Sequence, residues 1–435
     1  ALIHAGPRGS VTFHGDTVSI LGSVFAPGGF IGIKGADKFP TLDPNPTQAL
    51  ATVYIGPHSH LSTAGTVVLT PDAYGRRTGY VLPGGTISVS GNIIAEQGAV
   101  LDVSGTSGEL DLNPALLALT TTGDYLDGSI RVPFTSGLTT PVYGTASVRT
   151  TIDSNGGTII LDGGEELFTR ATLLGNAGGP TATGGTLLVS SGRFYPSGVT
   201  AEPDDLNLVV TQSRPNGTFF APGQSGIGKA IAGTPGMGYF AANDFQRGGF
   251  DNLQLGGNVQ FDGRVTIDAR GALSVGTGGV ISANDAVHLH ASYVSLGTLF
   301  APPMLPTQVQ NPFILAGQPF YFPPTFGPGT LTVTADHIDI GNLSLQNIGS
   351  ARLIADHGDV RGDGTFDIAG DLYIRAAQVY PVTGTTFTIA AYNHGGTQGS
   401  VTFERSGLNH LPLSAGGTLN VFAANIIQNG VLRAP

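Results

Sequence analysis

The sequence predicts an all-β protein, a right-handed parallel β-helix that carries several surface loop insertions. Apolar residues alternate with other residues in bursts of about three to five, which is the period of a half-buried strand. Gly, Asn or Asp separates one burst from the next, and 67 of the 435 residues are Gly. Strands this short bury little alone, but stacked in successive coils they share one continuous apolar interior.

The clearest run of predicted strands lies within residues 256–299, at 259–261, 265–267, 273–275, 280–281, 287–289 and 294–296. The same rhythm recurs in 9–35, 51–70, 84–105 and 156–190, and is almost unbroken from 329 to the end. At ~20–25 residues per coil, this amounts to roughly a dozen coils. Neighbouring strands lie ~4.8 Å apart, so we expect a rod ~55–60 Å long.

The string Gly-Gly-Thr followed by apolar residues occurs at positions 84, 156, 184 and 416. Gly tolerates the positive φ of a tight corner, and Thr and β-branched residues suit a pleated wall. Each occurrence therefore predicts a corner followed by a strand.

Residues 1–435 are predicted to form a single β-helix shaft region with five insertions, near 36–50, 71–83, 106–150, 191–250 and 300–328. These segments are rich in Pro, which cannot donate to a strand ladder. Domain linkers are the alternative, but the strand rhythm resumes after each break. Within the third insertion, 109–119 (ELDLNPALLAL) predicts a short helix lying on the solenoid.

Composition narrows the function. The net charge of −11 and the absence of a basic stripe argue against a nucleic-acid partner and against a polybasic membrane tether. No apolar run reaches the ~20 residues of a transmembrane segment. The lack of cysteine excludes disulfides, thiol catalysis and thiolate metal sites. The N-terminus shows no signal-peptide pattern, so a leader was removed or the chain is an interior piece.

Strand patterning continues through residues 399–434 without an evident cap. An open strand edge can recruit another strand. We therefore expect either that the natural protein continues or that another copy stacks end to end.

Two strings resemble the filamentous-haemagglutinin family of large bacterial exoproteins: residues 94–105 (IAEQGAVLDVSG) and residues 372–381 (LYIRAAQVYP). Related strings cover most of the rhythmic blocks but not the insertions. The resemblance implies a right-handed parallel β-helix shaft and an extracellular or bacterial cell-surface location. It also implies two-partner secretion, in which an outer-membrane transporter barrel is the partner during export. The family's secretion domain carries Asn-Pro-Asn-type motifs, and only Asp43-Pro44-Asn45-Pro46 comes close, so that domain is predicted to be missing.

Arg361-Gly362-Asp363 is the tripeptide that integrins recognise, and it lies between two predicted strands where a turn could expose it. A chance occurrence is the alternative in a chain rich in Gly and Asp turns.

Four Asp residues recur every fourth position, and we consider them as candidate calcium ligands: Asp359, Asp363, Asp367 and Asp371. The Gly-Gly-x-Gly-x-Asp nonapeptide of calcium-binding solenoids is absent, so turn capping is the favoured role. His288 and His290 share one strand face and are predicted to point outward, but no third metal ligand is evident. His58 and His60 are interpreted in the same way. The sequence predicts no cofactor.

Some β-helices cleave acidic polysaccharides with clustered carboxylates. The adjacent acid pairs Glu165-Glu166 and Asp204-Asp205 are expected to point to opposite faces and to make no site. The sequence therefore predicts a protein that is not an enzyme.

Aromatic residues concentrate in the insertions, where they either bind a sugar or protein partner or cover the solenoid wall. They are Phe219, Phe220, Tyr239, Phe240, Phe245, Phe250, Phe320, Tyr321, Phe322 and Phe326.

The function predicted from sequence is that of a structural and adhesive shaft that binds a host, cell-surface or matrix receptor or a glycan. The first alternative is a polysaccharide-binding or polysaccharide-cleaving β-helix of the lyase or tailspike type. The second alternative is a subunit of a self-assembling extracellular filament or matrix.

Overall fold

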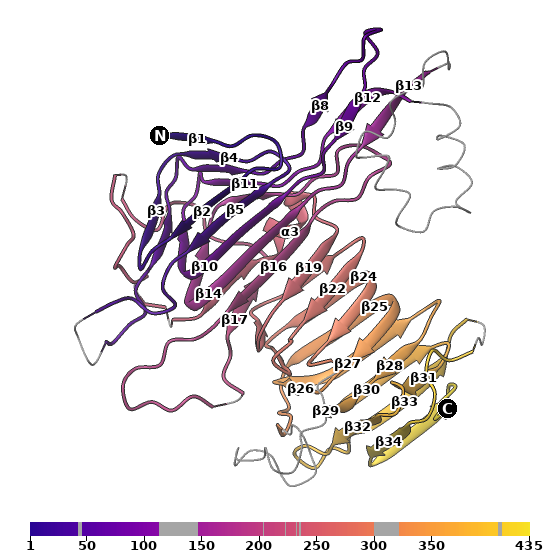
Figure 1. The fold of residues 1–435 in the computed structure, drawn as a ribbon. Coiled ribbons are helices and arrows are strands. Elements are labelled where there is room, and N and C mark those ends of the chain that lie inside the picture. The colour runs from indigo at the N-terminus through magenta and orange to yellow at the C-terminus, as the bar shows by residue number, and fades with distance from the viewer. Residues whose placement is uncertain are drawn as a thin grey trace.

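The computed structural model describes residues 1–41, 46–112, 147–202, 204–221, 223–231, 233–234, 236–299, 322–407 and 411–435. Its elements are almost all short strands, paired in parallel with strands of neighbouring coils along one column (Figure 1). The predicted parallel β-helix is confirmed. No helix in the described part of the chain is long and apolar enough to cross a membrane.

Three parallel ladders form the walls of the column. The first ladder runs through β2 (Ser10–His14), β5 (Phe30–Lys34), β10 (Thr86–Ala95), β14 (Thr158–Thr169), β16 (Thr186–Ser191), β19 (Asn252–Leu255), β22 (Ala272–Val275), β24 (Ala286–Leu296), β25 (Gly329–Ile340), β28 (Val360–Gly362) and β31 (Val379–Pro381).

The second ladder contains the ends of β10 and β14 and, with them, β3 (Val18–Ile20), β6 (Val53–Ile55), β18 (Gly238–Ala241), β17 (Leu208–Thr211), β20 (Val259–Phe261), β23 (Val280–Ala283), β26 (Leu343–Gln346), β29 (Gly364–Ala369), β32 (Thr386–Tyr392) and β34 (Thr418–Ala423).

The third ladder has two parts. The first part comprises β1 (Leu2–His4), β4 (Ser23–Phe25), β7 (His60–Ser62), β11 (Val100–Asp102) and β15 (Thr172–Leu174). The second part contains the beginnings of β24 and β25 and, with them, β21 (Val265–Asp268), β27 (Ile348–Ala355), β30 (Asp371–Ala376), β33 (Ser400–Arg405) and β35 (Asn425–Asn429).

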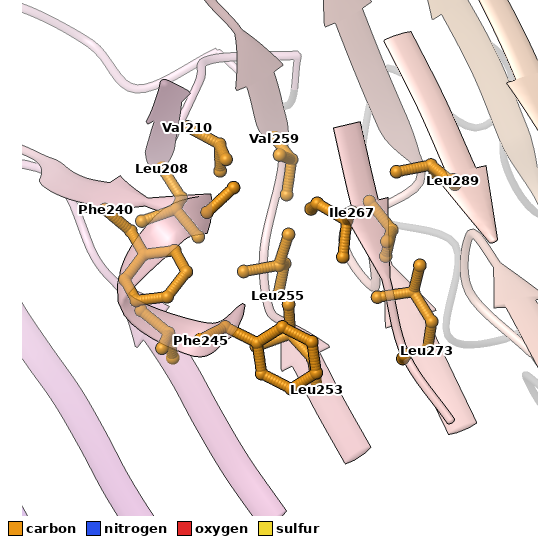
Figure 2. Packing of buried hydrophobic residues seen from close by; sticks show 14 of the residues in the cluster. Leu208, Val210, Phe240, Phe245, Leu253, Leu255, Val259, Ile267, Leu273 and Leu289 are labelled. Carbon is orange, nitrogen blue, oxygen red and sulfur yellow. The ribbon is translucent and has the colours of Figure 1, made fainter. Parts of the chain in front are cut away.

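A helical turn, α3 (Ala242–Gly248), lies between these two parts and contacts β15 and β21. Its Phe245 is fully buried and points into the same interior as the strand residues Leu253 and Leu255 (Figure 2). Gly249 ends the helix in the left-handed conformation, with φ of 72°, as is common at a helix C-terminus.

The core is one stack of inward side chains, because period-two alternation turns every second residue of each strand toward the axis. One hydrophobic cluster extends from Ile20 to Phe403. Along the first ladder, ten buried aliphatic residues occupy matched positions in successive coils: Ile31, Ile87, Ile159, Leu187, Leu253, Leu273, Val294, Ile338, Val360 and Val379.

The four Gly-Gly-Thr strings each precede a strand, as predicted, and β10, β14, β16 and β34 begin at the Thr. The predicted reason for the glycines is wrong at three of the four sites. Positive φ occurs only at Gly416, at 64°. At the other sites the corners stack so closely that a Cβ on Gly157 would overlap the carbonyl oxygen of Gly85. Close backbone approach therefore requires Gly there.

Two antiparallel hairpins project from the N-terminal half of the column and form a structure that we call the arm (Figure 1). They consist of β8 (Val67–Leu69) with β9 (Gly79–Val81), and β12 (Ser107–Leu112) with β13 (Val148–Asp153). Val81, Leu110 and Leu112 form a small separate core inside the arm. The helix predicted over 109–119 is wrong for residues 109–112, which belong to β12, and its remainder lies outside the described residues.

The segment 191–250 is not one ejected loop, because β17, β18 and α3 within it belong to the column. The described residues that remain without a regular element lie within 192–207 and 212–237, where residues 203, 222, 232 and 235 are outside the described part of the chain. In the first and last predicted insertions, residues 42–45 and 300–321 lie outside the described residues, and with them the Asp43-Pro44-Asn45 string.

Candidate functional site

The tripeptide Arg361-Gly362-Asp363 does not lie in an exposed turn, so that expectation is wrong. Arg361 and Gly362 end β28, and Asp363 is 7% exposed. A Cβ on Gly362 would collide with the ring of Phe387 in the core, which explains the Gly by packing. The Arg361 guanidinium forms a bidentate ion pair with Asp339, in which Nε donates to Oδ1 at 2.9 Å and Nη2 donates to Oδ2 at 2.7 Å.

Asp339 is the centre of a buried polar cluster on the outer face of the first ladder. It is 2% exposed, accepts a hydrogen bond from the Tyr293 hydroxyl at 2.7 Å, and lies 3.1 Å from His337 Nε2. Burial by itself raises the pKa of this carboxyl. The hydrogen bonds from His337, Arg361 and Tyr293, with the Arg361 charge, outweigh burial and lower the pKa of Asp339 to about 2.

The four periodic Asp residues are not brought together as a cation site. Asp359 is buried and accepts hydrogen bonds from Gln378 Nε2 at 3.0 Å and from the Tyr380 hydroxyl at 2.9 Å. Asp371 is exposed and accepts a hydrogen bond from Ser400. Among the described residues, no group of three or more His, Asp or Glu side chains could hold a metal ion.

Asp367 differs from the other three. It lies in β29 between the core residues Phe366 and Ile368, so its side chain points to the outer face, yet it is 3% exposed. Its Oδ1 has no hydrogen-bond partner among the described residues. Burial raises the pKa of Asp367 to about 7.

His288 and His290 point outward, as predicted. Val287 and Leu289, which alternate with them along β24, are buried and point inward. His290 Nδ1 lies 3.5 Å from Asp268 Oδ1 in the coil below. At the other predicted pair, the ring of His60 packs edge-on against Phe25 with centroids 5.1 Å apart, while His58 is exposed.

A polar groove with a volume of about 490 Å³ crosses four coils on the wall that carries His290. Small alanines form part of its lining, and acidic, basic and hydroxyl side chains rise beside them. The charged and imidazole groups are Asp268, Arg270, His290, Asp336, Asp356 and His357. This groove was not predicted from the sequence, although the register that aligns Asp268 with His290 and Thr334 repeats from coil to coil.

A second cavity, the aromatic cleft, lies where the loop 212–237 crosses the second ladder. Its volume is about 420 Å³, and β14, β17, β18 and the loop contribute to its lining. Phe168 and Tyr239 are stacked with centroids 5.0 Å apart, and Phe219 meets Phe168 edge-on at 5.9 Å. Arg170 and Arg214 line the same cavity.

The fully buried carboxylate of Glu96 fixes the loop over this wall. Its Oε2 accepts the backbone N–H of Phe219 at 2.6 Å, and its Oε1 accepts that of Phe220 at 3.1 Å. The neighbouring Gln97 side chain accepts the N–H of Gly217. Burial and the Glu96 charge raise the pKa of Tyr54, which packs beneath Phe220, to about 12. The loop is therefore held in a defined position before any ligand binds.

The acid pair Glu165-Glu166 occupies a bulge of β14 next to a smaller cavity of about 200 Å³, which Glu166 lines. Glu166 is 2% exposed, and burial, with the charge of Glu165, raises its pKa to about 8. Of the other pair, Asp205 lies 3.5 Å from Arg193. Within the described lining of the smaller cavity, Glu166 is the one carboxyl group.

The aromatic residues of the insertions divide between core and wall. Phe240, Phe245 and Phe250 belong to the continuous core. Phe219, Phe220 and Tyr239 pack on the outer wall and in part line the aromatic cleft. Phe322 is buried, and Phe326 stacks on His394 at 4.2 Å. Phe320 and Tyr321 lie outside the described residues.

Comparison with protein-family models, with curated proteins and with solved structures finds no match for this chain. The arguments about function therefore depend on the residues and on the geometry described above.

Proposed function

We propose that this protein is a structural and adhesive shaft, secreted or displayed on a bacterial surface. The observation that carries the proposal is the continuous core from Ile20 to Phe403, around which each coil is hydrogen-bonded to its neighbours. Such a column resists bending, because bending would part many ladder bonds and open the close-packed interior. The resemblance to filamentous haemagglutinins supports an outer-membrane transporter barrel as the partner during export.

The arm supports the adhesive part of the proposal. It stands away from the column (Figure 1) and presents Tyr74 near the tip of its first hairpin, 61% exposed, with the Arg76 guanidinium 5.4 Å from the ring centroid. Arg76 is 22% exposed and lies 3.7 Å from Asp72, so Tyr74 is the exposed member of this pair. Tyr is over-represented among the residues that dominate binding at protein interfaces. We therefore propose that the arm contacts the receptor and that the column holds the arm away from the bacterial surface.

Beads coated with the purified protein are expected to attach to an epithelial cell monolayer more than beads coated with albumin. Replacing Tyr74 by Ser is expected to lower attachment about tenfold or more, since an interface Tyr of this kind contributes about 2 kcal/mol. Leu21→Ser is the matched control, because Leu21 is 62% exposed but lies on the column. Attachment no better than that of albumin would overturn the adhesive role, and equal losses for both variants would overturn the role of the arm.

The polar groove favours a second candidate function, cleavage of an acidic polysaccharide. Hydrolysis of a glycosidic bond requires carboxyl groups on either side of it. Asp268, Asp336 and Asp356 lie along one groove with Arg270. The Arg270 Nη2 lies 2.5 Å from Asp251 Oδ1, so an acidic sugar would share this guanidinium with Asp251. Asp268 contacts His290, and Asp356 lies 3.3 Å from Arg375, whereas Asp336 forms no ion pair within the described structure. Asp336 is therefore the first residue to test.

If the shaft function holds alone, incubation with polygalacturonate releases no new reducing ends. If the groove cleaves the polymer, reducing ends accumulate, and Asp336→Asn is expected to lower the rate by about 10²-fold or more, the contribution of one acid–base group. The control is Asp371→Asn, which changes an exposed Asp outside the groove. Activity that survives Asp336→Asn unchanged would exclude Asp336 as the catalytic acid or base.

A further inference from the structure

The charge in the aromatic cleft differs from that of the protein as a whole. The chain carries a net charge of −11, yet the cleft is lined by two arginines and by no carboxylate among its described residues. Arg214 is neutralised, because its Nε donates to Asp244 Oδ2 at 2.6 Å. Arg170 has no carboxylate oxygen within 4 Å in the described part of the chain.

Arg170 is nevertheless held in place. Its guanidinium lies 4.0 Å from the centroid of the Phe219 ring, and Nη1 donates to the carbonyl oxygen of Gly217 at 2.9 Å. Nε and Nη2 make no hydrogen bond within the described structure. A guanidinium fixed in this way presents a planar pair of donors that matches the two oxygens of a carboxylate. Burial and, to a smaller extent, the guanidinium of Arg214, although it is paired with Asp244, lower the pKa of Arg170, whereas the charge of Glu96 raises it. A bound carboxylate adds a second negative charge that favours the ionised guanidinium.

The aromatic and hydroxyl side chains of the lining indicate what kind of molecule carries the carboxylate. Tyr239 and Phe219 are each partly exposed and offer ring surface. The C–H face of a pyranose packs against such rings. Around them, the Ser213 hydroxyl group can donate and accept hydrogen bonds. The hydroxyl groups of Thr211 and Thr234 donate to the carbonyl oxygens of Ser213 and Ile231, at 3.0 and 2.9 Å, and can still accept a hydrogen bond from a sugar hydroxyl. The volume of about 420 Å³ falls within the usual range of ligand sites.

We propose that the aromatic cleft binds an acidic sugar residue, stacked on Phe219 and Tyr239, with its carboxylate on Arg170. The aromatic side chains provide apolar contact, the hydroxyl groups bind the sugar hydroxyls, and the arginine distinguishes acidic from neutral sugars. The hydrogen bonds from the backbone N–H groups of Phe219 and Phe220 to the Glu96 carboxylate hold Phe219 in place before the ligand binds. Less conformational entropy is then lost on binding. This assignment adds a glycan contact on the column to the receptor contact of the arm, and in that sense it rests on the adhesive function.

The test is calorimetric titration of the full chain with trigalacturonate, with sialyllactose and with neutral lactose. The two acidic saccharides separate a uronate from a sialate as the source of the carboxylate. We expect at least one of them to bind, and lactose to bind about tenfold more weakly or worse, since a charge-assisted hydrogen bond contributes about 1.5–3 kcal/mol. Binding is also expected to weaken as salt rises.

Arg170→Gln is expected to weaken binding of the acidic saccharide about tenfold or more and to leave lactose unaffected. Arg352→Gln is the matched control, because Arg352 lies 4.2 Å from the centroid of the Tyr373 ring on another wall. Phe219→Ala is a second variant, which removes the stacking surface while Arg170 remains. Unchanged far-UV circular dichroism shows that each variant is folded.

The proposal fails if neither acidic saccharide binds, or if Arg170→Gln binds the acidic saccharide as tightly as the unmodified protein. The comparison of Arg170→Gln with the unmodified protein isolates the cleft, because the polar groove is a second place where an acidic saccharide could bind. If the protein binds an acidic saccharide but does not attach to cells, the cleft is a saccharide site and the adhesive function is rejected. If it attaches to cells but binds no acidic saccharide, the adhesive function stands and the saccharide site is rejected.

Discussion

Replacing Asp339 by Ala is expected to lower the free energy of unfolding by about 3–5 kcal/mol, the usual consequence of removing one partner of a buried ion pair. The substitution leaves the Arg361 guanidinium, 22% exposed, without its carboxylate, and it removes the acceptor for the Tyr293 hydroxyl. Urea unfolding at pH 7, followed by circular dichroism, measures the change.

Asp268→Ala is the control, because Asp268 is 61% exposed and its contact with His290 is at the surface. Its expected effect is below about 1 kcal/mol. The double variant Asp339→Leu/Arg361→Met removes both charges and is expected to be less destabilised than Asp339→Ala. Equal effects of Asp339→Ala and Asp268→Ala would show that the buried cluster contributes no more than a surface pair.

The same carboxylate sets an acid limit on stability. The pKa of Asp339 is about 2 in the folded chain and near 4 in the unfolded chain, so the unfolded chain binds more protons between these values. The stability that Asp339 contributes is fully present above about pH 4 and is lost as the pH falls toward 2. Asp339→Ala is expected to flatten this part of the stability profile.

The β-helix could be predicted from the sequence because its rule is local. Each strand places alternate residues inward, so Val265 and Ile267, or Val287 and Leu289, already show the face that they bury. The helix α3 could not be predicted in this way, since its single buried aromatic, Phe245, fills a place that neighbouring coils fill with strand residues. Phe245 is buried because of where α3 packs in the column, and no alternation of apolar residues in the sequence indicates this.

The glycine corners were located correctly but for the wrong reason. The strings at 84, 156 and 184 align in successive coils, as the pairing of Thr86 with Thr158 and of Thr158 with Thr186 shows. A repeated Gly at a corner satisfies either a positive φ or a close approach of backbones, and a sequence does not separate the two. Coordinates are needed to show that one carbonyl oxygen lies where the next Cβ would be.

The candidate sites escaped prediction because each assembles residues that are far apart in the sequence, from neighbouring coils or from a loop that packs on them. Arg361, Asp339 and Tyr293 lie in three coils and are joined by hydrogen bonds. Arg361 therefore pairs with a residue of the neighbouring coil, which the order of residues in the tripeptide does not indicate. The aromatic cleft joins Arg170 to a ring 49 residues further on, at Phe219. A composition rich in aromatic residues marked the insertion but did not indicate which rings would enter the core.

Asp367→Asn is expected to stabilise the protein at pH 8 and to leave it almost unchanged at pH 4. Burial raises the pKa of Asp367 from 3.8 to about 7, so the folded chain retains a proton that the unfolded chain has lost between about pH 4 and pH 7. Stability therefore falls as the pH rises through this window, the reverse of the slope that Asp339 produces. A rise of about three pKa units corresponds to about 4 kcal/mol when the group is fully ionised, and Asn removes that penalty because it never ionises.

Urea unfolding of Asp367→Asn and of the unmodified protein at pH 4, 6 and 8 measures this window, and the difference in unfolding free energy is expected to grow at each step. Asp371→Asn is the control, four residues further along the chain, exposed, and expected to change stability by within about 0.5 kcal/mol. A difference between Asp367→Asn and the unmodified protein that stays constant with pH would mean that Asp367 is already ionised in the folded chain at pH 4. The carboxyl would then have a partner that compensates its burial, and the outer face of β29 would be more polar than the described residues make it.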